Sequence, residues 1–226
     1  MASSATSRAR ALAERDLEPR AALPYAFHVT DAIIGLDSQA LMICFQLDGA
    51  SFETADLRDL NDWHAKLNGA WRNLADDRLA IWHHIVRRPH DAYPAGAFRS
   101  AFAADLDARY RERLAGRQMF VNDLYVSLVL HPGRETADRA GAWLTGAGAR
   151  QPGIESEAVE RLEQAGRDLE QYLSRYGLRP LGLSERDGLW FSEPMALIRL
   201  LLTGRLEPAP LVRGHLGDAA YSARII

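Results

Sequence analysis

The stretch VTDAIIGLDSQALMICFQL, residues 29–47, predicts a β-hairpin and with it the type of fold. Its two halves, 29–36 and 40–47, are rich in β-branched and large apolar residues, which favour strands. Asp37 and Ser38 between them are typical of a hairpin turn. We therefore predict an antiparallel strand pair near the start of the folded body.

Helices and further strands follow outward from this hairpin. Apolar residues at alternating steps of three and four predict a helix, with Leu57, Leu60, His64, Leu67, Trp71 and Leu74 on one face. A four-residue step predicts a second helix that Gly116 ends, with Phe98, Phe102, Leu106, Tyr110 and Leu114 on its stripe. Strands are predicted at 79–86 and 119–130, on either side of this helix.

The second half of the chain begins with a Gly- and Pro-containing connector at 131–153. A helix at 158–176, a short hairpin around Asp187 and Gly188, and a last helix at 195–203 follow it. This order predicts an α+β fold, with a mixed or antiparallel sheet of about four to six strands covered by three to four helices.

We expect three parts along the chain. Residues 1–24 form an Arg-containing flexible leader, and residues 25–204 form the α+β domain. Residues 205–226 contain Pro and Gly and are expected to form an extended tail that leads toward further chain.

Composition excludes several classes of protein. The 226 residues carry a formal net charge of −3, so no overall basic field favours nucleic acid. Cys44 is the only cysteine, which excludes an intramolecular disulfide and a cysteine-based metal cluster, and its apolar neighbours predict a buried, inert thiol. No apolar run approaches the roughly 18 residues of a spanning helix. We expect a cytoplasmic chain that reaches a membrane only peripherally or through a partner.

No cofactor site is predicted within the chain, for either a nucleotide or a metal. The Gly-rich phosphate-binding loop that ends in Gly-Lys-Ser/Thr is missing from the sequence. Lys66 is the only lysine, and it lies inside the first predicted helix with no glycine pattern before it. Nucleotide hydrolysis is therefore not expected from these residues.

Two alternative functions stay open on the residues alone. One is a small hydrolase that uses His83, His84 or His90 with a nearby carboxylate, although adjacent strand residues such as the first two point to opposite faces. The other is a nucleic-acid-binding domain with an Arg-rich face, made of Arg87, Arg109, Arg113 and Arg117.

Four stretches of the chain carry a family resemblance in their order and spacing. They are LPY (23–25) with HVTD (28–31) before II (33–34), LDG (47–49) with FETAD (52–56) and LN (60–61), LAIWHH (79–84) with RR (87–88), and YRERL (110–114) with FVNDLY (120–125). Together they resemble the amino-terminal domain of the CagE/TrbE/VirB family, the larger energising ATPases of type IV secretion and conjugation machines. Residues 204–216 resemble its continuation.

The resemblance implies a non-catalytic docking and oligomerisation domain at the cytoplasmic face of the bacterial inner membrane. It implies three kinds of partner: the small VirB-type membrane subunit, other inner-membrane components of the apparatus, and further copies of the ATPase. The Walker motifs of the family lie beyond the matching domain. We therefore expect this chain to stop before the nucleotide-binding segment, and we expect ATP and Mg²⁺ to bind only the longer parent protein.

The residues expected to contact partners come from the leader and from the region between the third and fourth predicted strands. They are Arg8, Arg10, Arg15, Arg87, Arg88 and Tyr93, together with exposed aromatic residues near Tyr93.

Overall fold

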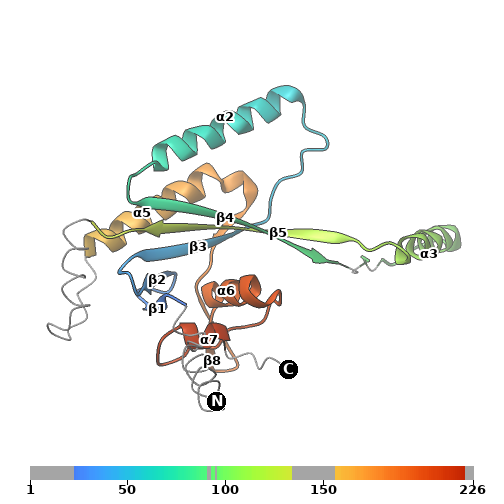
Figure 1. The fold of residues 1–226 in the computed structure, drawn as a ribbon. Helices are drawn as coiled ribbons and strands as arrows, with labels where there is room; N and C mark the ends of the chain where they lie inside the picture. Colours follow the sequence, from blue (N-terminus) through green and yellow to red (C-terminus); the bar gives the residue numbers. More distant parts are fainter. Residues whose placement is uncertain (1–22, 91–92, 95, 134–155, 222–226) are drawn as a thin grey trace, which may run out of the picture.

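The structure is a computed structural model that describes residues 23–90, 93–94, 96–133 and 156–221 (Figure 1). Its strands are β1 (Tyr25–His28), β2 (Ile33–Leu36), β3 (Leu41–Leu47), β4 (Leu79–Pro89), β5 (Phe120–Leu130), β6 (Leu178–Pro180), β7 (Leu183–Arg186) and β8 (Leu189–Ser192). Its helices are α2 (Leu57–Leu74), α3 (Ala101–Ala115), α5 (Ser156–Tyr172), the 3-10 helix η2 (Ser174–Tyr176), α6 (Glu193–Thr203) and α7 (Gly217–Tyr221). The predicted α+β class is confirmed.

A six-stranded sheet forms the centre of the molecule. Its strands lie in the order β1-β2-β3-β5-β4, and β6 pairs with the last three residues of β3. Every pairing in this sheet is antiparallel. β7 and β8 form a separate two-stranded hairpin. The sheet therefore has β4 at one edge, and β1 and the short β6 at the other.

The hairpin predicted from residues 29–47 is present as β2 and β3. Its first strand is shorter than predicted, because the Val29 and Thr30 N–H groups both donate to the Ile33 carbonyl oxygen and turn the chain back toward β1. Gln39 closes the turn between the strands in the left-handed region, with a φ of 65°. Sequence analysis had not predicted β1, which precedes the first predicted strand.

Both faces of the sheet are covered. Helices α2 and α5 lie over one face, and α6 and α7 lie over the other (Figure 1). Successive residues of β3 point to opposite faces, so that Ile43 and Phe45 pack beneath α5 while Met42 and Cys44 pack toward α6. Because both faces of β3 are covered over its first five residues, Leu41 to Phe45 are all apolar and buried.

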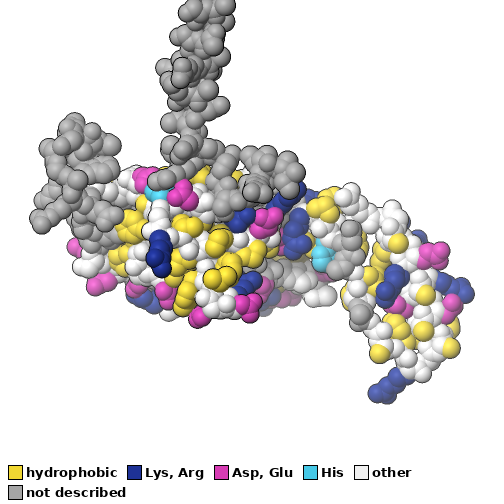
Figure 2. Space-filling view, turned by 90° about the horizontal axis from the view of Figure 1, so that it is seen from below, with side chains coloured by type: hydrophobic (Ala, Val, Ile, Leu, Met, Phe, Trp, Pro, Cys, Tyr) yellow, Lys and Arg dark blue, Asp and Glu magenta, His cyan; other side chains and the backbone are white. Residues whose placement is uncertain are grey.

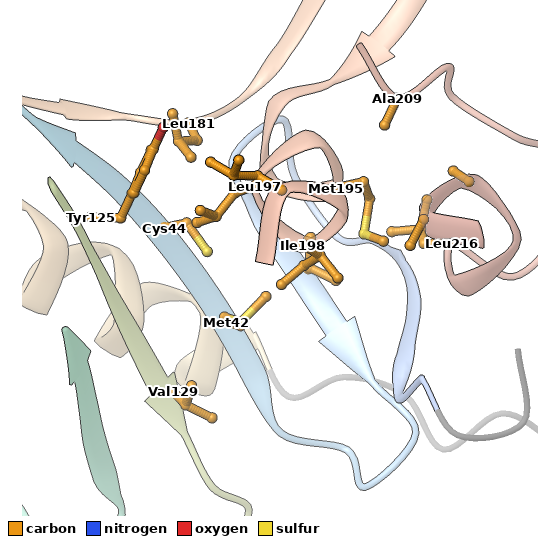
Figure 3. Close-up of a cluster of buried hydrophobic side chains, with 14 of the residues drawn as sticks. Met42, Cys44, Tyr125, Val129, Leu181, Met195, Leu197, Ile198, Ala209 and Leu216 are labelled. Atoms are coloured by element: carbon orange, nitrogen blue, oxygen red, sulfur yellow. The ribbon is translucent and has the colours of Figure 1, made fainter. Parts of the chain in front are cut away.

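The core on the α6 side contains the single cysteine. Figure 3 shows Cys44 between Met42 and Tyr125 of the sheet and Leu197 of α6. Burial raises the pKa of the Cys44 thiol to about 11, while the hydroxyl of Ser127 donates a hydrogen bond to its sulfur at 3.2 Å. The prediction of a buried thiol is confirmed.

The segment after α6 belongs to the same core, which corrects the extended tail predicted for residues 205–226. Ala209, Leu216 and Ala220 are buried in it, and the Leu216 N–H donates to the Ala26 carbonyl oxygen at 2.9 Å. Small, widely spaced apolar residues give no periodic signal, so the sequence pattern did not reveal this packing. Residues 222–226 and the leader up to residue 22 lie outside the described residues.

Candidate interaction surface

The far half of the β4–β5 ribbon extends away from the rest of the sheet. β3 pairs with β5 only as far as Leu124, so residues 120–123 of β5 pair with β4 alone. The chain between β4 and β5 carries α3 at the far end of this ribbon, apart from the helices that cover the sheet (Figure 1). We call the described residues between 85 and 124 the arm.

Helix α3 forms from local interactions. The Ser100 hydroxyl accepts a hydrogen bond from the Ala103 N–H at 3.2 Å and caps the first turn. Arg109 pairs with Asp105 one turn earlier at 2.9 Å, an arrangement that stabilises an exposed helix. Gly116 ends the helix, as the sequence predicted. The helix therefore needs no packed core to define its limits.

The apolar stripe of α3 is exposed. Phe102 is 77%, Leu106 58% and Tyr110 57% exposed. All of α3 is described and none of its residues is buried, whereas α2, α5 and α6 each bury residues against the sheet. Figure 2 shows this lobe at its right, with hydrophobic side chains lying between charged ones. An apolar stripe of this kind on a protruding helix is typical of a surface that another protein covers.

Three of the predicted contact residues lie on the arm. Arg88 forms a two-point ion pair with Asp123 across the ribbon, through Nε at 2.5 Å and Nη2 at 3.2 Å. The hydrogen bonds that Arg88 donates to this carboxylate, together with its negative charge, raise the pKa of Arg88. Arg87 stacks over the Phe120 ring at 4.6 Å from its centroid, a cation–π contact. Both arginines are thus held by the ribbon, and the Arg87 side chain is exposed.

Tyr93 anchors the connection between β4 and α3. Its hydroxyl donates to Asp107 Oδ1 at 2.8 Å, and this hydrogen bond raises the pKa of the phenol. The Arg111 guanidinium lies 4.6 Å from the centroid of the Tyr93 ring. Tyr93 therefore contacts α3 through Asp107 and Arg111, which lie one turn apart on the helix. The exposed aromatic residues expected near it are present as Phe98 and Phe102.

The predicted leader contacts Arg8, Arg10 and Arg15 lie outside the described residues. Sequence reasoning also missed two exposed apolar residues of the ribbon, Ile85 at 60% and Phe120 at 43%. The signal that could have found them is a pair of neighbouring apolar residues beside polar ones, Ile85-Val86 before two arginines and Phe120-Val121 before Asn122.

The adjacent histidines that suggested a hydrolase, His83 and His84, do not point into a common site. His83 and His84 pair with Val126 and Tyr125 of β5 and lie on opposite faces of the ribbon. Burial, and to a smaller extent the neighbouring His83, lowers the pKa of His84. The His84 and Trp82 rings lie edge to face, with their centroids 6.4 Å apart. Within the described residues no three His, Cys, Asp or Glu side chains could hold a metal ion together.

Two cavities are lined by other residues and by no histidine. The larger, about 300 Å³, lies between α6 and the β7–β8 hairpin. Arg179 at its wall pairs with Glu193 at 2.7 Å and donates to the side-chain oxygen of Gln46. Arg179 and Glu193 therefore neutralise each other at this wall.

The arginines of α3 do not give the arm a basic field. The helix holds three acidic residues and three arginines, and Arg109 and Arg111 both form ion pairs with acids one turn away. Arg113 lies at its end and Arg87 stacks on Phe120. Balanced charge of this kind favours a protein partner over a nucleic acid.

No helix in the described part of the chain has the length and the apolar character to cross a bilayer.

Comparison with known proteins gives a consistent picture. Residues 32–138, which include β2 to β5 and the arm, match the family described as "Type IV secretion system ATPase VirB4/TrbE, N-terminal domain". The type IV secretion system protein virB4 of Bartonella quintana is 36% identical over 216 residues, which are 94% of this chain and 28% of that protein.

More distant relatives match over a similar length. Protein virB4 of Agrobacterium fabrum is 33% identical over 207 residues, 90% of this chain and 26% of that protein. The type IV secretion system protein PtlC of Bordetella pertussis is 28% identical over 223 residues, 96% of this chain and 27% of that protein. The chain thus spans little more than a quarter of the length of these curated relatives.

Proposed function

Because the chain belongs to the VirB4/TrbE family of type IV secretion system ATPases and carries its N-terminal domain, we propose that it is a docking module whose contact surface is the arm. In this proposal it holds the ATPase at the cytoplasmic face of the bacterial inner membrane. Its partner is the small VirB-type membrane subunit, with further copies of the ATPase as neighbours. Nucleotide hydrolysis, with ATP and Mg²⁺, belongs to other parts of the parent protein.

The exposed stripe of α3 is the observation that carries this proposal. Phe102, Leu106 and Tyr110 lie one turn apart and present apolar surface that no described residue of the chain covers. Burial of one such side chain is worth about 1.5–3 kcal/mol. Three of them in a row therefore supply enough free energy for the centre of an interface, with the ion pairs of α3 at its rim.

The ribbon makes this stripe available at a distance from the core. Arg88 and Asp123 fix the two strands to each other, and Tyr93 fixes the connection to α3. A helix held in this way keeps its orientation without packing on the body, so less freedom is lost when a partner binds. The arm is thus suited to docking rather than to enclosing a substrate.

Co-purification of this chain with the membrane subunit tests the proposal. The two are co-expressed, solubilised in mild detergent and captured through a tag on the chain. We expect the unaltered chain and Ala108→Asp to retain the subunit, and Leu106→Asp to lose it. Both substitutions add one carboxylate at an exposed position of α3, but residues 106 and 108 lie on opposite sides of the helix.

Two results would overturn the proposal. Failure of the unaltered chain to retain the membrane subunit would refute docking on that partner. Equal retention by Leu106→Asp and Ala108→Asp would remove the α3 stripe from the interface. Separately, ATP turnover by the purified chain, above that of a boiled sample, would contradict its non-catalytic role.

A further inference from the structure

One edge of the central sheet is open. β4 lies at the end of the strand order and pairs with β5 along all eleven of its residues, while no other described strand pairs with it. The edges of antiparallel sheets carry unpaired N–H and C=O groups that can accept a further strand. The open edge is long for such a site, since most strands have about five or six residues.

The register identifies which residues present these groups. The His90 N–H donates to the Met119 carbonyl oxygen, and the His131 N–H donates to the Arg78 carbonyl oxygen. These two bonds extend the β4–β5 ladder at either end. Because hydrogen-bonded pairs recur at every second residue, the even-numbered residues of β4 form their backbone hydrogen bonds with β5. The odd-numbered residues therefore point their N–H and C=O groups away from β5, toward the open edge. Those with no backbone hydrogen-bond partner among the described residues are Ile81, His83, Ile85 and Arg87.

The two ends of this row are closed. The Leu79 N–H already donates to the Asp76 carbonyl oxygen, and Pro89 has no N–H to offer. An added strand would therefore pair with about seven residues, from 81 to 87. Its length is set by the edge itself.

The side chains along this edge are apolar and cationic. Trp82 is 46% and Ile85 60% exposed, on opposite faces of the ribbon. β4 contains two arginines, two histidines and no carboxylate. Arg88 is neutralised by Asp123, whereas Arg87 forms no ion pair with a described residue. The charge that would complement the edge is thus a carboxylate beside Arg87.

We propose that β4 receives an extended segment of a partner protein as an additional antiparallel strand, with apolar side chains at alternate positions and an acidic residue beside Arg87. Main-chain hydrogen bonds to Ile81, His83, Ile85 and Arg87 supply affinity, and the apolar and acidic side chains supply selectivity. The inference deepens the proposed docking function and rests on it, but it uses the edge of the ribbon rather than the α3 stripe.

A second copy of the chain fits this edge less well. Pairing of β4 with another β4 would bring four arginines and four histidines to one ribbon without adding any carboxylate from that strand. Arg87 would then gain no partner of opposite charge. The complementary occupant is for this reason an acidic segment of a different protein.

A synthetic peptide tests the inference without the membrane subunit. The probe is Ac-Glu-Thr-Val-Thr-Val-Thr-Val-NH₂, which in antiparallel register places its Glu beside Arg87 and its valines beside Ile85, His83 and Ile81. Binding to the full 226-residue chain is followed by the backbone amide resonances of ¹⁵N-labelled protein. We expect titrating shifts, and slowed hydrogen exchange, at the amides of Ile81, His83 and Ile85.

Two altered peptides separate the contributions of backbone and charge. N-methylation of the first two valines removes two N–H groups that would donate hydrogen bonds to β4. Because each of these hydrogen bonds contributes to the binding free energy, we expect the affinity to fall about tenfold or more. Replacement of Glu by Lys exchanges an attractive pair for a repulsive one, with an expected fall of about threefold to tenfold. Equal affinity of the parent and N-methylated peptides would overturn strand addition.

Substitution in the chain gives a matched pair at one position. His83→Pro removes one outward N–H and keeps the bonds to β5, while His83→Ala removes the side chain and keeps the N–H. We expect His83→Pro to weaken peptide binding about fivefold or more and His83→Ala to leave it unchanged. Should His83→Pro fail to fold, the N-methylated peptide decides the same question on the unaltered chain.

The remaining outcomes are also decisive. Protection of the Ile81, His83 and Ile85 amides that rises with chain concentration in the absence of peptide would show that a second copy takes the edge, and would overturn the inference. Peptide shifts confined to α3 would overturn it too. Neither result affects retention of the membrane subunit through Leu106, so failure of the edge and failure of the docking proposal are distinguishable.

Discussion

Truncation of Leu106 and of Leu169 to alanine compares the same chemical change on two helices. Leu106 lies within α3 and is 58% exposed, while Leu169 lies within α5 and is fully buried between that helix and the sheet. Each substitution removes the same atoms and exchanges one good helix former for another. Any difference between their effects on stability therefore reports packing within this chain.

The expected magnitudes differ severalfold. Leu169→Ala loses the transfer free energy of its side chain and leaves a cavity among residues such as Leu162 and Phe45, which costs about 2–5 kcal/mol. More than half of Leu106 already meets water, and no enclosed cavity can form around it. Its truncation is expected to cost about 1 kcal/mol or less.

Urea unfolding followed by circular dichroism measures both values. Leu169→Ala should shift the midpoint strongly at an unchanged slope, and should lower Tm by roughly 5–15 °C. Leu106→Ala should stay within a few degrees of the parent chain. An equal loss of stability in the two variants would refute the reasoning, because it would show that the α3 stripe packs within this chain and is not available to a partner.

Three further predictions concern the body of the chain. Gly177 has a φ of +62°, and a Cβ there would meet Asp48 Oδ2 at 2.5 Å, so Gly177→Ala should cost about 1–3 kcal/mol in urea unfolding. Gly188→Ala, where φ is +75° but the surrounding space is open, should cost only about 1 kcal/mol, and equal costs would contradict the clash. Burial lowers the pKa of His28, with Thr30 and Asp31 opposing it, so the unfolded state takes up the proton first as pH falls. The free energy of unfolding should therefore fall below about pH 6.5, less steeply in His28→Gln, and an unchanged slope in that variant would contradict this assignment. The Cys44 thiol, with its pKa raised to about 11, should not react with a disulfide reagent in the native chain and should react fully in guanidinium, whereas rapid native labelling would contradict its burial.

Part of the candidate interaction surface could be predicted from the sequence, but the contacts that each of its residues makes could not. Arg87, Arg88 and Tyr93 were predicted as contacts, and all three lie on the arm. Arg88 and Tyr93 are held by Asp123 and Asp107, partners 35 and 14 residues away in the chain. Such pairings depend on strand register and on helix placement, which local patterns do not encode.

The family resemblance was carried by motifs that lie mostly on elements of the sheet and the arm, and the comparisons confirm it. The packing of residues 205–220 against β1 and α6 was missed for a different reason. Ala209, Leu216 and Ala220 are buried by distant partners, and small residues show no amphipathic period.

The sequence by itself determined where most of the helices and strands form, with β1 and α7 as exceptions. Residues 29–47 contain the β2–β3 hairpin. Helix α2 ends at Leu74, the last residue of its apolar stripe, and α3 ends before Gly116. Only the tertiary structure decided which apolar stripes are buried. Leu67, Trp71 and Leu74 of α2 pack toward the sheet, whereas Phe102 and Leu106 of α3 meet water. Periodicity specifies one face of a helix, but burial requires a second surface opposite it, and the β4–β5 ribbon carries α3 beyond every such surface among the described residues.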